Sequence, residues 1–111
     1  MSFIALFAMT LGFTSCDPNA PEGSVKVTNN SSMMLSSFTI VFCNEYGENI
    51  DKKNFGDFAH GEVCSMVIPI GASRWYCGTL INSTWYFSPF YNTSTKSVVL
   101  TQSMVYQWTT N

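Results

Sequence analysis

Few side chains in this sequence are suited to acid–base or nucleophilic catalysis, and their spacing matches no catalytic motif. The chain has one histidine, His60, which stands next to Gly61 in a predicted turn. No serine lies in a Gly-x-Ser-x-Gly segment, the sharp turn that presents a nucleophilic serine beside a histidine base. A Ser-His-acid arrangement is therefore not predicted.

Acidic residues could act in pairs or hold a cation. Glycoside hydrolysis needs two carboxylates at a defined separation on a rigid scaffold, and an EF-hand loop needs calcium ligands at fixed positions. Several acids fall in one polar stretch, but their spacing does not match these patterns: Glu45, Glu48, Asp51 and Asp57. We expect these carboxylates to face solvent in a loop, and we predict no enzyme activity, no metal and no cofactor.

Aromatic residues are better candidates for a functional role, and they make up 15% of the chain. A binding face is predicted from five that lie in or beside two predicted strands: Trp75, Tyr76, Trp85, Tyr86 and Tyr91. Side chains of a strand point alternately to opposite faces. Burial of both tryptophans together with Phe87 would therefore turn Tyr76 and Tyr86 outward, or the reverse. The outward rings could stack on a sugar or pack on a partner protein; alternatively, the rings fill a small core.

Cys43, Cys64 and Cys77 remain once Cys16 is set aside, so at most one disulfide forms among them. Cys64 and Cys77 lie on two predicted strands, 63–68 and 74–81, that could form a hairpin and bring them face to face. Such a disulfide would contribute about 3 kcal/mol. The alternative is three buried, reduced thiols acting as small apolar side chains. The sequence contains no Cys-x-x-Cys motif.

The beginning of the chain carries a different kind of chemistry. Residues 1–16 have no charged side chain, and the apolar run from Phe3 to Phe13 is too short to cross a bilayer as a helix. It has the length of a secretory signal core. The following Thr14-Ser15-Cys16 resembles a bacterial lipoprotein lipobox, which implies cleavage before Cys16 and acylation of that cysteine, for example with palmitate. A plain secretory signal and a short buried segment are the alternatives.

This resemblance predicts three parts of the chain. Residues 1–15 are expected to be a signal peptide, residues 16–23 a lipidated cysteine with a flexible, proline-containing tether, and residues 24–111 one domain. The expected location is the bacterial cell envelope, with the domain anchored in the membrane through the lipid on Cys16.

Composition and patterning predict an all-β domain. Charged residues are only 11% of the chain and the net charge is −2, so nucleic acid is not an expected partner. Turn-forming residues recur between short apolar segments, which favours a single antiparallel β-sandwich, Ig-like or transthyretin-like, of about seven strands. The predicted strands are 25–28, 35–43, 63–68, 74–81, 84–87, 97–100 and 104–109.

The layout resembles the small β-sandwich lipoproteins of gut Bacteroidetes, many of which have no assigned function. The similar features are Phe13-Thr14-Ser15-Cys16 with its acidic, proline-containing tether, the first strand ending in Val27-Thr28-Asn29-Asn30-Ser31-Ser32, the turn Pro69-Ile70-Gly71 before an aromatic strand, and the closing Val105-Tyr106-Gln107-Trp108. The resemblance implies fold and location more than activity.

From these features we expect a non-catalytic exported lipoprotein domain that binds a glycan or a partner protein at the cell envelope. One alternative is a structural subunit of a cell-surface assembly that adds a neighbour's strand to a sheet edge. Another is an inhibitor or immunity-type lipoprotein. The identity of the ligand and the membrane leaflet are not encoded in any motif of the sequence.

Overall fold

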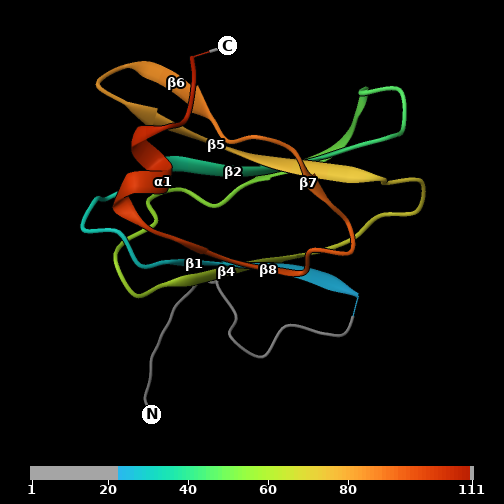
Figure 1. The fold of residues 1–111 in the computed structure, drawn as a ribbon, viewed down its shortest axis with the longest axis horizontal. Helices are drawn as coiled ribbons and strands as arrows, with labels where there is room; N and C mark the ends of the chain where they lie inside the picture. Colours follow the sequence, from blue (N-terminus) through green and yellow to red (C-terminus); the bar gives the residue numbers. More distant parts are fainter. Residues whose placement is uncertain (1–22, 111) are drawn as a thin grey trace.

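A computed structural model describes residues 23–110, which form two stacked β-sheets (Figure 1). The expected all-β sandwich is therefore confirmed. The predicted signal peptide, Cys16 and residues 17–22 lie outside the described residues. The elements in chain order are β1 (Ser24–Asn29), β2 (Ser36–Cys43), β3 (Asn49–Asn54), β4 (Val63–Val67), β5 (Arg74–Ile81), β6 (Thr84–Phe87), β7 (Tyr91–Asn92), β8 (Ser97–Leu100) and α1 (Gln102–Tyr106).

The larger sheet has the strand order β3-β2-β5-β6, and β7 also pairs with β5; all of its pairs are antiparallel. The predicted strands 74–81 and 84–87 are present and pair as the hairpin β5–β6. Its turn consists of Asn82 and Ser83, whose φ angles are +51° and +67°. Positive φ at both central residues characterises the tight turn whose twist matches that of the flanking strands. This turn pairs Ile81 with Thr84 and fixes the register of the hairpin.

The smaller sheet has the order β4-β1-β8, and its pairing departs from the expectation. β4 runs antiparallel to β1, but β8 runs parallel to it, so a fully antiparallel sandwich was wrong. A parallel pair cannot be joined by a short turn and needs a long connection between its strands. Here the connection passes through the whole larger sheet before the chain returns at β8.

The predicted hairpin of 63–68 with 74–81 is also wrong. β4 pairs with β1 and β5 pairs with β2, so the intervening residues carry the chain from one sheet to the other. Cys64 and Cys77 thus lie in different sheets and are not strand neighbours, so the hairpin on which a possible disulfide between them depended is absent from the described residues. Cys77 is a free thiol in the core, and burial raises its pKa well above the usual range.

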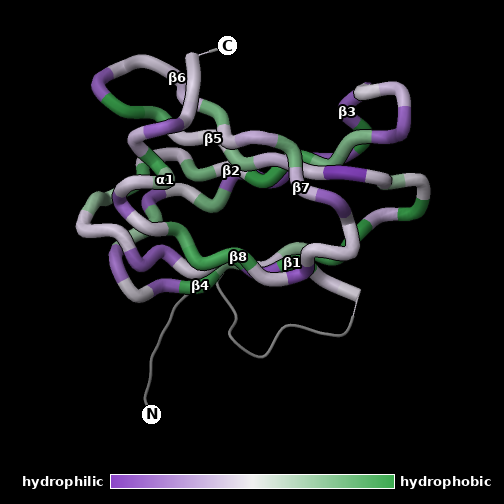
Figure 2. The backbone as a smooth tube through the Cα atoms, viewed as in Figure 1, coloured by the Kyte–Doolittle hydropathy of each residue, from purple (hydrophilic) through white to green (hydrophobic). Residues whose placement is uncertain are grey.

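Two further segments differ from the sequence-based prediction. β3 was not predicted because Asn49–Asn54 is almost entirely polar; it pairs with β2 as an exposed edge strand and is largely hydrophilic in Figure 2. Charged residues on an edge strand hinder pairing with other chains. The predicted strand 104–109 is not formed: residues 104–106 belong to the short helix α1, and Thr109 makes an isolated β-bridge with Phe87. The helix begins after Thr101, whose side chain accepts a hydrogen bond from the Met104 N–H.

Apolar side chains from both sheets and from α1 meet between the layers. Trp75 is the largest fully buried side chain, and its indole N–H donates to the carbonyls of Asn92 and Thr95. Val105 of α1 and Trp108 beyond it also belong to the core. The other buried apolar residues of this core are Val25, Val27, Leu35, Phe38, Ile40, Phe42, Phe55, Phe58, Cys64, Cys77, Val98 and Leu100.

Asn29 at the end of β1 ties two loops together from inside the fold. Its Nδ2 donates to the carbonyl oxygens of Phe58 (2.8 Å) and Met33 (3.0 Å). Its Oδ1 accepts from the backbone N–H (2.9 Å) and the hydroxyl (2.6 Å) of Ser31. His60 Nδ1 lies 2.8 Å from the Ser31 carbonyl oxygen. The single histidine therefore takes part in this loop structure through the backbone of Ser31.

Candidate functional site

The outer face of the larger sheet gathers aromatic side chains that point away from the core. The register of the β5–β6 hairpin pairs Gly78 with Phe87 and Leu80 with Trp85. Residues paired across a sheet share one face, so Trp85 and Phe87 lie on the same face as Tyr76 and Gly78. Neighbouring residues along the strands, such as Trp75, face the core instead.

Four of these side chains form a continuous aromatic row, defined as Trp85, Phe87, Tyr76 and Phe90. The Trp85 and Phe87 rings are nearly parallel, with their centroids 6.2 Å apart and an angle of 11°. Phe87 meets Tyr76 edge to face at 5.9 Å, and Tyr76 meets Phe90 in the same way at 5.4 Å. At the end of the row, the Arg74 guanidinium lies 4.8 Å from the centroid of the Phe90 ring. Such ring pairs and the cation–π contact hold the row in place.

The five residues of the predicted binding face are thus divided between two surfaces. Trp75 is buried in the core, and Tyr86 and Tyr91 pack against that core. The centroids of the Tyr91 and Trp75 rings are 4.9 Å apart. Burial raises the pKa of the Tyr91 hydroxyl. Only Tyr76 and Trp85 belong to the outer face. The expectation that both tyrosines 76 and 86 share an orientation was wrong.

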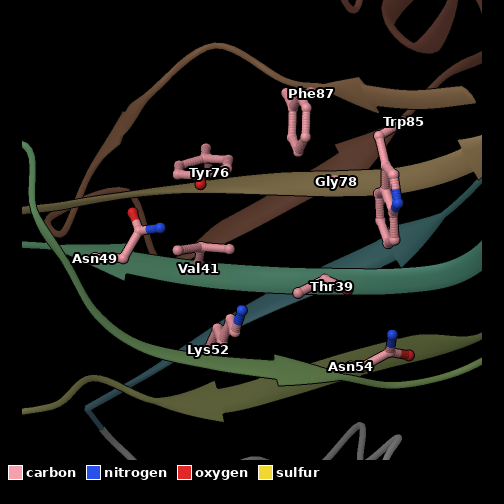
Figure 3. A pocket seen from close by; sticks show the side chains of 9 residues that line it. All are labelled: Thr39, Val41, Asn49, Lys52, Asn54, Tyr76, Gly78, Trp85 and Phe87. Carbon is pink, nitrogen blue, oxygen red and sulfur yellow. The ribbon is translucent and has the colours of Figure 1, made fainter. Parts of the chain in front are cut away.

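Beside the aromatic row, the outer face is hollowed into a trough of about 520 Å³ (Figure 3). One wall is made by Tyr76, Phe87 and Trp85. The floor of the trough and the wall opposite the aromatic one consist of shorter or polar residues from β2, β3 and β5: Thr39, Val41, Asn49, Lys52, Asn54 and Gly78. A second hollow of about 320 Å³ shares Asn49, Tyr76 and Phe87 with the trough and reaches Phe90.

Gly78 makes room for the aromatic wall. A Cβ atom at this position would lie 3.0 Å from Phe87 Cδ1, 3.1 Å from Phe87 Cε1 and 3.7 Å from Trp85 Cε3. The two rings therefore rest directly on the backbone of β5. A glycine within a strand often marks a close approach of this kind, and this signal in the sequence would have pointed to Gly78 and its neighbours.

The four clustered acids, Glu45, Glu48, Asp51 and Asp57, are all exposed. Glu48 accepts a hydrogen bond from Asn44 Nδ2 at 2.7 Å, in the exposed turn between β2 and β3. Between residues 23 and 110, no group of three or more histidine, cysteine or acidic side chains is placed to hold a metal ion. The chemistry that the outer face offers is therefore aromatic contact beside amide, hydroxyl and ammonium groups.

Comparison of the chain with protein-family models, with curated proteins and with solved structures finds no match. In the part of the chain that the structure describes, no helix is long and apolar enough to cross a membrane. The assignment of function therefore depends on the site itself.

Proposed function

We propose that this domain is a non-catalytic binding module that holds a glycan in the trough beside the aromatic row. The observation that carries the proposal is the arrangement of the two walls: Tyr76, Phe87 and Trp85 lie on one side of the floor, and Lys52 and two asparagines lie on the other. A sugar ring has apolar C–H faces and a polar rim of hydroxyl groups. It matches such a trough by packing one face on the rings while its rim bonds to the polar wall.

A protein partner has less support at this surface. Specific protein interfaces bury about 800 Å² on each partner, usually around a well-packed apolar centre. Here the rings of the aromatic row pack edge to face or in parallel on one another, which leaves Trp85 38% and Phe90 54% exposed. A concave trough with one polar wall favours a slender ligand.

Strand addition has little support at the edges of the larger sheet. The β3 edge carries Asp51, Lys52 and Lys53, which oppose pairing with a neighbouring strand. On β6, the backbone of Phe87 already exchanges two hydrogen bonds with Thr109, at 2.7 and 3.1 Å.

Replacing Trp85 with alanine is expected to weaken glycan binding by about tenfold or more, because it removes the most exposed ring of the aromatic wall. Binding of a panel of neutral and acidic hexasaccharides can be measured by isothermal titration calorimetry. The matched control is Tyr106→Ala, which removes a 69% exposed ring on α1 that does not line the trough. Equal affinities of the wild type and Trp85→Ala would contradict the proposed site.

The envelope location is part of the same proposal, and it is supported by the lipobox-like Thr14-Ser15-Cys16. Two or more acyl chains make membrane attachment effectively stable, since each buried CH₂ contributes about 0.8 kcal/mol. Cys16→Ser is therefore expected to move the protein from the membrane fraction to the soluble fraction of a bacterial host. A variant that still sediments with membranes would contradict lipid anchoring through Cys16.

A further inference from the structure

The polar wall of the trough presents hydrogen-bond donors toward the aromatic row. It consists of Asn49, Lys52 and Asn54, all from β3. In Figure 3 the nitrogen atoms of these three side chains lie on the side toward the trough. An ammonium group can only donate hydrogen bonds, whereas an asparagine amide has a donating and an accepting end. The orientation of the two amides therefore decides what this wall can bind.

Both amides use their oxygen atoms inside the protein. Asn54 Oδ1 accepts from the backbone N–H of Gly56 at 2.8 Å, and Asn49 Oδ1 accepts from the Cys43 thiol at 3.2 Å. A backbone N–H can only donate, so the oxygen of Asn54 must face Gly56 and its NH₂ group is left for a ligand. Among the described residues, no hydrogen bond engages Nδ2 of either asparagine.

A β-bulge brings Asn49 to this wall. Phe42 pairs with Asp51 and Cys43 pairs with Asn49, so one additional residue of β3 lies between these pairs. A bulge re-aims the side chains on one side of it. Asn49 therefore faces the trough together with Lys52 and Asn54, although strict alternation would turn it to the opposite face.

The trough also has an uncompensated positive charge. Among the described residues that line it, Lys52 is the one charged side chain and none is a carboxylate. Asp51 and Lys53 alternate with Lys52 along β3, and Lys53 instead lies 5.3 Å from the Phe55 ring centroid. A ligand that offers several acceptors and a negative charge would match an ammonium flanked by two NH₂ groups, because hydrogen bonds between ionised partners are the stronger ones.

We propose that the glycan bound in this trough is an acidic one, a chain that contains uronic acid residues. One sugar ring packs on Trp85 and Phe87, and its carboxylate accepts hydrogen bonds from Lys52 Nζ and from the amide groups of the two flanking asparagines. This inference rests on the proposed glycan-binding function and names the class of glycan. A neutral hydroxyl matches the wall less well, since it brings no negative charge to the Lys52 ammonium.

The test compares acidic oligosaccharides with uncharged forms of the same sugars. Hexamers of galacturonic acid and of mannuronic acid, and a hyaluronan hexamer, are titrated into the protein, each beside its methyl ester. At least one acid hexamer is expected to bind more than tenfold tighter than its ester. Lys52→Met is expected to abolish that preference, because it weakens binding of the acid much more than binding of the ester. The matched control is Lys53→Met, which removes the same charge from a side chain that does not line the trough.

The outcomes separate this inference from the proposed function. Tighter or equal binding of the methyl esters, or binding of neutral cellohexaose or xylohexaose alone, would overturn the acidic class and leave glycan binding intact. A preference for the acids that survives Lys52→Met would also overturn the assignment of the charge to this trough, whatever the result for Lys53→Met. Absence of binding to every acidic and neutral hexamer would contradict both proposals.

Discussion

Replacing Asn29 with alanine is expected to lower the free energy of unfolding by about 3 kcal/mol. The side chain of Asn29 is fully buried and takes part in four hydrogen bonds. Alanine would leave the carbonyl oxygen of Met33 and the N–H of Ser31 without these partners, whereas the Phe58 carbonyl keeps its hydrogen bond from the Leu35 N–H at 3.0 Å. A buried polar group that loses its partner costs about 1–3 kcal/mol, so the sum is large even after some relaxation.

The loss is measured by urea unfolding, followed through the fluorescence of the buried tryptophans. For a domain of this size, about 3 kcal/mol corresponds to a melting temperature lower by roughly 12–24 °C. The matched control is Asn30→Ala, because Asn30 is the next residue in the chain and is exposed. Equal losses in the two variants would mean that the buried hydrogen bonds of Asn29 are not the cause.

The arrangement of the strands was only partly predictable, because local sequence patterns indicate where a strand lies but not which strand it pairs with. Turn residues and apolar segments marked β1, β2, β4, β5, β6 and β8 correctly, since these signals are local. The pairing of β4 with β1 joins residues far apart in the chain, and the same short connection at 68–73 would suit either a hairpin or a passage between sheets. Burial of both sheets' inner faces decides the choice, and that is a property of the whole fold.

In contrast, the sequence was sufficient to predict which aromatic side chains face the core and which lie on the outer face of the larger sheet. A two-residue turn at Asn82 and Ser83 pairs Ile81 with Thr84, so even-numbered residues of β5 share a face with odd-numbered residues of β6. Tyr76 must then lie on the side of Trp85 and opposite to Tyr86. The prediction applied the alternation of side chains to each strand separately and did not use the register across the turn. It therefore placed Tyr76 and Tyr86 on the same face, which was wrong.

The polar wall could not have been derived in this way. β3 is almost entirely polar and gives no strand signal, and the bulge that places Asn49 beside Lys52 has no marker in the sequence. The hydrogen bonds that engage the two asparagine oxygens depend on Cys43 and Gly56, whose positions follow from the completed sheet. The aromatic half of the site is thus encoded locally, and its polar half arises from strand pairing.

Gly78→Val is expected to reduce glycan affinity at least about tenfold while the domain stays folded. The new Cβ would approach two carbon atoms of Phe87 to 3.0 and 3.1 Å, which is too close, so the ring must move. Phe87 contacts Tyr76 on one side and Trp85 on the other, and its displacement disturbs the whole aromatic wall. The free energy of unfolding should change by less than about 1 kcal/mol, since valine favours a strand more than glycine does and this offsets the strain.

A graded series distinguishes this steric effect from a general perturbation of β5. Gly78→Ala should give a smaller loss of affinity than Gly78→Val, because a single methyl group requires the edge of the Phe87 ring to move by only a few tenths of an ångström. Ser65→Val places the same side chain on the outer face of β4 in the other sheet and should leave affinity unchanged. Calorimetric titration with the tightest-binding hexamer provides the affinities, and far-UV circular dichroism checks the fold. Full affinity in a folded Gly78→Val protein would mean that the ligand does not depend on the rings over this glycine, and the binding site would then have to be sought elsewhere on the domain.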